Sequence, residues 1–199
     1  MATARDTRAR ALPPDARRAA IVEAILPLCQ QQGAALSTRQ IAEAAGIAEG
    51  TIFRAFADKD ALFDAVIEAA FDPADLIARL DAIPAESSLA EALIATVTAL
   101  QERVQRLAGL LTAINPARHR IDAARTAERA RVEIAPMARV IERHRAQLRV
   151  DPTRAAQIVR GLTFATTHPL FITDDPSSPE EIVDFVLDGL RGDSTETSC

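Results

Sequence analysis

Residues 37–63 carry the pattern that most constrains how this chain can fold: two short segments joined at a glycine and followed by a third. Ile41, Ala44 and Ala45 give the first segment an apolar stripe at helical spacing. Gly46 then permits the left-handed backbone of a sharp turn, because it has no Cβ atom. The pattern predicts a helix-turn-helix, a motif that binds DNA.

Polar side chains mark the starts of these segments. Ser37 and Gln40 have the spacing of a capping box, in which each side chain satisfies a free backbone N–H group at a helix start. Asp58 is placed to cap the third segment. We expect the second helix of the motif over Glu49 to Phe56, with its first turn facing outward.

The pattern resembles the DNA-binding domain of the TetR family of bacterial one-component regulators over residues 14–72. The matching positions in the four helices of that domain are, in chain order, Ile21, Ile25, Leu28 and Gly33; Thr38, Ile41, Ala42, Ala45 and Gly46; residues 50–56; and residues 58–62. Two positions depart from the family pattern. Phe53 replaces a Tyr whose hydroxyl meets a phosphate, and Pro27 lies inside the first helix.

The resemblance implies a double-stranded DNA operator as partner. The implied DNA-binding residues are Thr38, Arg39, Ala48, Glu49, Gly50, Thr51, Phe53, Arg54 and Lys59. Thr38, Arg39, Thr51 and Arg54 can reach phosphates or base edges, and Lys59 can hold a phosphate beside a helix start. Glu49 can accept a hydrogen bond from a cytosine amino group, and Gly50 allows close backbone approach.

Composition favours an all-helical chain. Of the 199 residues, 48% are hydrophobic, which is enough to build a core, and Trp and Tyr are absent. No segment shows the sustained alternation of a half-buried strand. Together with the resemblance, this predicts an all-α fold: an N-terminal three-helix DNA-binding domain joined by a fourth helix to a C-terminal ligand-binding and dimerisation bundle.

The expected divisions of the chain are a flexible basic arm (1–13), a helix-turn-helix domain (14–72), an effector-binding and dimerisation domain (73–192) and a disordered tail (193–199). Residues 1–18 hold five arginines against two aspartates, so they either follow DNA phosphates or form a solvated tail. The net charge of −5 argues against non-specific coating of nucleic acid.

Capping residues, often followed by proline, divide the remaining sequence. They predict helices near 73–82, 88–113, 117–149 with a break near Pro136, 152–167 and 178–191. The arginine-rich residues 117–131 are either a solvated segment or a patch for an anionic ligand or nucleic acid.

The long helix predicted over 88–113 has one apolar stripe, formed by Leu93, Val97, Leu100, Val104, Leu107 and Leu111. Its simplest role is the core of a bundle. In TetR-like proteins the same helix also borders an effector cavity, which implies a small apolar or amphipathic effector. The candidate effector contacts are Leu100, Val104, Leu107, Leu111, Phe164 and His168. The sequence leaves open which of them line a cavity, and His168 can equally be a helix-end residue.

The last helix has two apolar stripes where a surface helix needs one. The first holds Ile182, Phe185, Val186 and Gly189, and the second holds Val183, Leu187 and Leu190. This suggests that one stripe faces a partner chain, as in the four-helix dimer interface of TetR-like proteins. The candidate interface residues are Ile158, Leu162, Ile182, Phe185, Val186 and Gly189.

Motifs for catalysis, cofactors and metals are missing from the sequence. The histidines are far apart, and no nucleophile-base pair or phosphate-binding loop occurs. No apolar run is long enough to cross a bilayer and no signal peptide is visible, so we expect a cytoplasmic protein. Cys29 is expected to be a small core residue; a redox sensor is the alternative.

We therefore expect a homodimeric transcriptional regulator, usually a repressor in this family, that binds a palindromic operator and is released by a small-molecule effector. One alternative is a helical ligand- or protein-binding dimer whose helix-turn-helix is vestigial. A second is an enzyme that uses the bundle cavity, for which no catalytic residues can be named. DNA binding distinguishes the first interpretation from the others.

Overall fold

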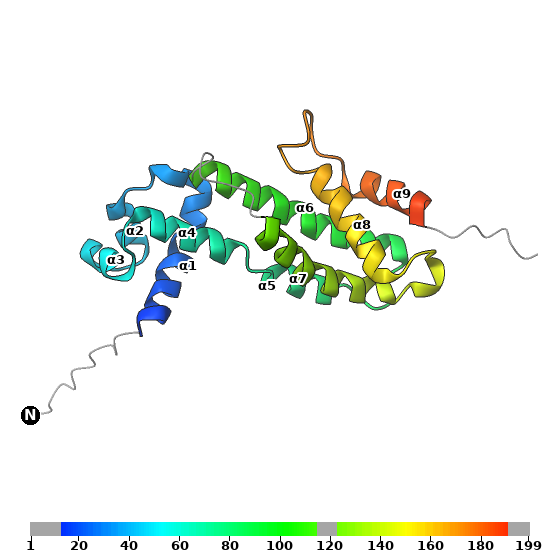
Figure 1. The fold of residues 1–199 in the computed structure, drawn as a ribbon, viewed down its shortest axis with the longest axis horizontal. Helices are drawn as coiled ribbons and strands as arrows, with labels where there is room; N and C mark the ends of the chain where they lie inside the picture. The colour runs from blue at the N-terminus through cyan, green and yellow to red at the C-terminus, as the bar shows by residue number, and fades with distance from the viewer. Residues whose placement is uncertain (1–12, 115–122, 191–199) are drawn as a thin grey trace, which may run out of the picture. The chain divides into compact units, whose positions relative to one another are not determined.

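The computed structural model describes residues 13–114 and 123–190. The predicted arm before Pro13, the predicted helix start at Asn115-Pro116 and the predicted tail lie outside these ranges. The described ranges contain α-helices and 3-10 turns and no strand, so the predicted all-α class is confirmed. The chain divides after Ala70 into two compact units (Figure 1). In the described part, no helix combines the length and apolar character needed to cross a membrane.

The N-terminal unit contains α1 (Pro14–Gln32), a 3-10 turn (Gly33–Ala35), α2 (Thr38–Ala44), α3 (Glu49–Ala55) and α4 (Lys59–Ala70). Each α-helix contributes apolar side chains to one core, among them Ile25, Ile41, Ile52 and Val66. Burial of these side chains holds the short helices in place, since α2 and α3 have too few residues to be stable alone. Pro27 lies inside α1 and does not end it.

The predicted signals of the helix-turn-helix are present. Ser37 Oγ accepts from the Gln40 backbone N–H at 3.3 Å, and the Ser37 backbone N–H donates to Gln40 Oε1 at 2.9 Å. Gly46 has a φ of 63°, the left-handed conformation expected at the turn. Asp58 Oδ1 accepts from the Ala61 backbone N–H at 2.7 Å and caps α4. These bonds mark where α2 and α4 begin, whereas the N-cap residue of α3, Ala48, makes no side-chain capping bond.

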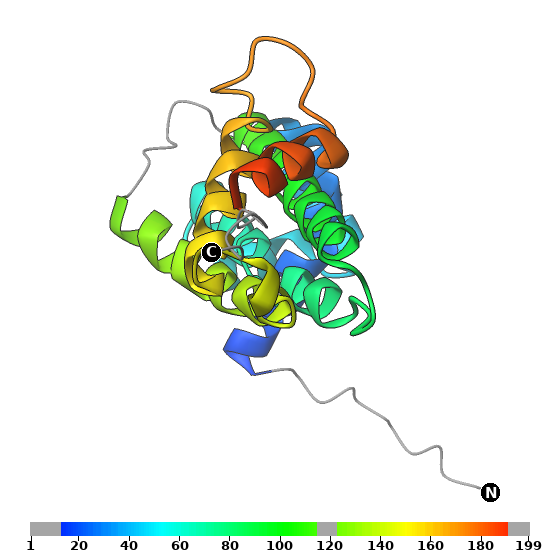
Figure 2. The ribbon, with the colours of Figure 1, turned by 90° about the vertical axis from the view of Figure 1, so that its right-hand side faces the viewer.

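The C-terminal unit contains α5 (Ala74–Asp81), α6 (Leu89–Ile114), α7 (Ala123–Glu142), a 3-10 turn (Arg145–Gln147), α8 (Pro152–Ala165) and α9 (Pro179–Leu190). Seen from the end of the bundle, α9 lies beside α6 and α8 (Figure 2). The predicted caps are again present: Ser88 pairs with Glu91, Asp151 accepts from the Arg154 backbone N–H, and Ser178 pairs with Glu181.

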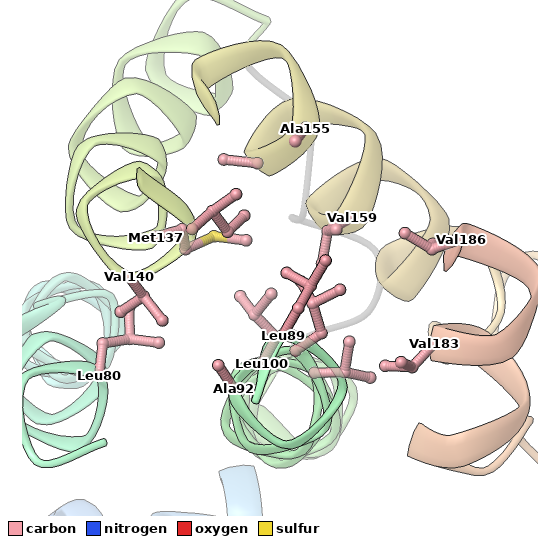
Figure 3. Close-up of a cluster of buried hydrophobic side chains, with 14 of the residues drawn as sticks. Leu80, Leu89, Ala92, Leu100, Met137, Val140, Ala155, Val159, Val183 and Val186 are labelled. Atoms are coloured by element: carbon pink, nitrogen blue, oxygen red, sulfur yellow. The ribbon is translucent and has the colours of Figure 1, made fainter. Parts of the chain in front are cut away.

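The core of this unit is made of aliphatic side chains from each of these α-helices. Figure 3 shows part of it, with Leu100 of α6, Met137 of α7, Val159 of α8 and Val183 of α9 directed toward one another. Leu93, Val97 and Leu100, the first half of the predicted α6 stripe, are all buried there. Burial of this many apolar side chains is the main stabilising term of the unit.

The predicted helix break near Pro136 is wrong. α7 runs without interruption from Ala123 to Glu142, and Pro136 is buried inside it. A proline removes one hydrogen bond to the carbonyl four residues earlier, here that of Val132. Val132 is exposed, so water can satisfy its carbonyl while the flanking turns are held by packing.

Candidate DNA-binding site

The outward face of α3 is defined by what its other face buries. Ile52 and Phe56 are almost wholly buried and attach α3 to the N-terminal unit. On the outer side Ala48, Glu49, Gly50, Phe53 and Arg54 are exposed, and Thr51 is half-buried. Phe53, which departs from the family pattern, is 51% exposed, although Phe is among the residue types most often buried.

Two arginines supply positive charge to this surface. Arg39 of α2 and Arg54 of α3 are both exposed. Within the described ranges, neither guanidinium has a hydrogen-bond or ion-pair partner. Guanidinium groups bind phosphate oxygens strongly because they offer several N–H donors and a permanent charge. The pair can therefore contact an anionic ligand without breaking an interaction within the protein.

Thr38 and Glu49 are not independent of each other. The Thr38 hydroxyl donates a hydrogen bond to Glu49 Oε1, joining the first residue of α2 to the first residue of α3. No sequence pattern indicates this bond, because it depends on how the turn at Gly46 brings the two helix starts together.

Lys59 is the first residue of α4, and Arg18 of α1 contacts Ala55, the last residue of α3. The Lys59 ammonium is 5.2 Å from the centre of the Phe63 ring. Arg18 belongs to α1 and is no part of a basic arm, in contrast to the expectation for residues 1–18. Its guanidinium donates to the Ala55 carbonyl and lies 4.4 Å from the centre of the Phe56 ring. Arg18 therefore satisfies a carbonyl at the end of α3.

Gly50 has a conformation and surroundings that do not require glycine. A Cβ atom at this position would meet no other atom within 4 Å, and its φ lies outside the left-handed region. Glycine in a helix is less stable than alanine by about 0.5–1 kcal/mol. Nothing in the described part of the chain therefore requires a glycine at this position.

We predict that Gly50→Ala stabilises the protein by up to about 0.5–1 kcal/mol and weakens DNA binding. Urea unfolding and fluorescence anisotropy with labelled DNA measure the two effects. Gly109→Ala in α6 is the matched control, because a Cβ there also meets nothing within 4 Å. It should stabilise similarly without changing DNA affinity. Unchanged DNA affinity in Gly50→Ala would show that no partner approaches this point closely.

Cys29 is a buried core residue, as expected. Burial raises the pKa of the Cys29 thiol to about 11, and the nearby Lys59 charge offsets only part of this. The thiolate is the reactive form of cysteine. At neutral pH Cys29 is therefore a thiol inside the folded unit, which does not favour a redox role.

A buried ionic network lies inside the C-terminal unit. Glu133 of α7 accepts from Arg103 Nε of α6 at 2.9 Å and from Arg160 Nε of α8 at 2.8 Å. Arg103 also donates to the carbonyls of Phe71 at 2.7 Å and Asp72 at 3.0 Å, just before α5. The side chains of Arg103 and Glu133 are only 6% and 9% exposed. The network joins three helices to the segment that precedes α5.

The candidate effector residues differ in their surroundings. Leu100 is part of the aliphatic core, where the packing of α7, α8 and α9 against α6 covers it. Val104, Leu107 and Leu111 are half-buried. The Phe164 and His168 rings lie 4.8 Å apart beside the α8–α9 connection. A surface depression of about 620 Å³ over α5, α7 and α8 is lined by other residues, including Asp81, Arg139 and Pro152.

The two-stripe interpretation of α9 is wrong for this unit. Ile182 and Val186, assigned to the partner-facing stripe, are 2% and 3% exposed and lie in the core with Val183 and Leu187. Because α9 packs against both α6 and α8, its buried face is wide enough to hold residues of both stripes. Phe185 is the residue that faces outward, with 74% of its surface exposed. Ile158 and Leu162 of α8 are half-buried, and the side-chain surroundings of Gly189 lie outside the description.

The fold and the outward face of α3 together define a helix-turn-helix protein with a helical C-terminal unit. Residues 21–66 match the sequence model described as "Bacterial regulatory proteins, tetR family". This span includes α2, α3 and the Arg39 and Arg54 side chains. Residues 21–66 therefore form a helix-turn-helix domain of the TetR-family type, as the resemblance implied.

Solved structures with the same fold are distant in sequence. A TetR/AcrR-family regulator from Thermobifida fusca is 22% identical, with 87% of this chain and 95% of that chain covered and a TM-score of 0.56. The regulator SCO0520 from Streptomyces coelicolor is also 22% identical, with 89% and 99% covered and a TM-score of 0.52. The superantigen PfiT is 19% identical, with 92% and 100% covered and a TM-score of 0.55. No curated protein sequence matches the chain significantly.

Proposed function

We propose that the protein is a repressor that binds a palindromic DNA operator as a homodimer and is released by a small-molecule effector. The observation that carries this proposal is the exposed Arg39 and Arg54 beside the outward face of α3, neither of which is paired within the described ranges. Phosphate contacts supply most of the sequence-independent affinity for DNA, and base contacts at a helix start supply specificity.

Dimerisation explains why a palindrome is expected. Two identical recognition helices related by a two-fold axis fit successive major grooves when they are about 34 Å apart. Of the six large apolar side chains that are exposed in the described ranges, Phe164, Leu170, Phe171 and Phe185 lie on α8, on α9 or between them. Apolar side chains gathered in this way favour a protein partner, here a second copy of the chain.

Effector release requires a site whose occupation changes the affinity for DNA. The half-buried Val104, Leu107 and Leu111 on α6 supply apolar surface for an apolar or amphipathic molecule. Coupling between two sites is reciprocal, so operator DNA must weaken effector binding by the same factor. A thermal-shift screen of apolar compounds followed by operator titration with each hit tests this part of the proposal.

The alternative is a ligand- or protein-binding dimer with a vestigial helix-turn-helix. The observation in its favour is Phe53, which offers no hydroxyl to a phosphate although it is exposed. The fold does not decide between the two functions, because the superantigen PfiT shares it. Selection from a pool of randomised duplexes separates them: a regulator enriches a palindrome and a vestigial domain enriches nothing.

We predict that Arg39→Ala and Arg54→Ala each weaken operator binding, and that the salt dependence falls by about one unit of slope for every phosphate that the variant no longer neutralises. Anisotropy titrations from low to moderate salt give the slope. Arg131→Ala on α7 removes an exposed arginine of the other unit and is the control. Wild-type slopes in both the α2 and α3 variants would mean that DNA does not bind on this surface.

A further inference from the structure

The hydrogen bond between Thr38 and Glu49 restricts what each residue can do on the DNA-binding surface. A threonine hydroxyl has one proton to donate, whereas an ionised carboxylate can only accept. The Thr38 proton is therefore directed to Glu49 Oε1. A phosphate oxygen is also an acceptor only, so Thr38 cannot donate to a phosphate while this bond is made. This argues against the phosphate contact that the sequence suggested for Thr38.

The same hydrogen bond restricts the orientation of Glu49. Thr38 is its only hydrogen-bond or ion-pair partner among the described residues, and Arg39 and Arg54 do not pair with it. Glu49 is exposed at the first position of α3, and its second carboxylate oxygen, Oε2, has no such partner within those residues. A free glutamate side chain samples several rotamers, and a hydrogen bond from a neighbouring helix reduces that freedom.

We propose that Thr38 is a positioning residue that holds Glu49 so that its free oxygen accepts a hydrogen bond from the exocyclic amino group of one base. The inference rests on the proposed function, since it assumes that α3 enters the major groove. Cytosine and adenine present amino donors there, whereas guanine and thymine present acceptors at the corresponding place. A carboxylate is repelled by those acceptors as well as by the phosphates. Glu49 therefore selects cytosine or adenine and excludes guanine and thymine at one position of each half-site.

Thr38 and Glu49 act as a unit in this proposal. Removal of the hydroxyl frees the carboxylate to turn into water, so selectivity at that one position should fall while the remaining DNA contacts stay. A phosphate contact by Thr38 would have the opposite signature, because phosphates carry no sequence information and removing such a contact weakens all sites equally. The two roles are thus distinguishable by comparing related duplexes.

The experiment uses the full chain and an operator obtained by selection from randomised duplexes. Selection is repeated with Glu49→Ala, and the position at which the base preference disappears identifies the base that Glu49 contacts. Affinities for the four base pairs at that position, changed in both half-sites, are then measured for wild type, Thr38→Val, Thr38→Ser, Glu49→Ala and the double variant Thr38→Val/Glu49→Ala. Circular dichroism confirms that each variant is folded.

We expect wild type to discriminate by about 5- to 150-fold at this position, the usual range for one base contact. Thr38→Val should abolish most of this discrimination, Thr38→Ser should keep it, and Thr38→Val should have no further effect when Glu49 is Ala. Equal weakening of all four duplexes by Thr38→Val, or additive effects in the double variant, would overturn the inference. The inference would also be overturned if the Glu49→Ala variant kept the wild-type base preference at every position of the operator. If wild type enriches no sequence at all, the proposed function itself fails.

Discussion

Glu133→Ala should destabilise the protein by about 3–5 kcal/mol, the usual effect of removing one partner from a buried ion pair. Glu133 is the only carboxylate that contacts Arg103 and Arg160 among the described residues. Its removal leaves the Arg103 guanidinium buried without a counter-charge. Urea unfolding followed by circular dichroism, at equal protein concentrations because dimers gain stability with concentration, measures the change.

Glu128→Ala is the matched control, because Glu128 lies on the same helix and also pairs with an arginine. Its ion pair with Arg131 is exposed on both sides, and exposed pairs contribute at most about 1 kcal/mol. Both variants remove a glutamate from α7, so the difference between their free energies of unfolding reports the effect of burying the ion pair. Similar unfolding midpoints for the two variants would mean that water reaches Arg103 and that the network is not a buried one.

The network also illustrates what sequence patterns cannot predict. Arg103 lies between Leu100 and Val104 of the α6 stripe, at a position where an arginine is normally exposed. Glu133, which pairs with it, is 30 residues further along the chain, so no local spacing indicates the pair. A buried charge is recognisable only when its counter-charge is placed in space.

Helix starts, in contrast, are predictable because their signals are local in the sequence. Ser37, Ser88 and Ser178 each pair with a residue three positions later, so the signal is complete within four residues. The effect of Pro136 is not local, because it depends on packing around α7 and on the exposure of Val132. Local chemistry determines where these helices begin, and tertiary contacts determine whether a proline ends one.

The candidate DNA-binding surface is partly predictable. The turn at Gly46 and the burial of Ile52 follow from local sequence, so the outward position of Glu49, Gly50 and Arg54 can be expected. The Thr38–Glu49 bond cannot, since it crosses the turn between two helices. On α9, the spacing of apolar residues shows two stripes but cannot show that α6 and α8 together bury most of both.

Phe185→Glu should convert the proposed dimer to a monomer and abolish high-affinity operator binding. Phe185 is exposed within its own chain, so the substitution removes little packing from the protomer. In an interface, the new carboxylate would be desolvated without a partner, which opposes association by several kcal/mol. The exposed residues around it, Glu181, Asp184 and Asp188, add like charges. Sedimentation equilibrium measures the oligomeric state, and anisotropy measures operator affinity.

Two further variants make this prediction specific to the α8–α9 surface. Val132→Glu places the same charge at an exposed apolar position on α7, and it should leave the dimer intact. Gly161→Leu on α8 tests the surface independently, because a side chain there meets no atom of its own chain within 4 Å at Cβ. It should fold normally yet weaken association if a partner helix packs closely against α8.

A dimer that persists in both Phe185→Glu and Gly161→Leu, with helical content unchanged, would place the interface elsewhere on the chain. Monomers that still bind the palindrome with full affinity would separate operator recognition from the α8–α9 surface, since a single recognition helix contacts only one half-site.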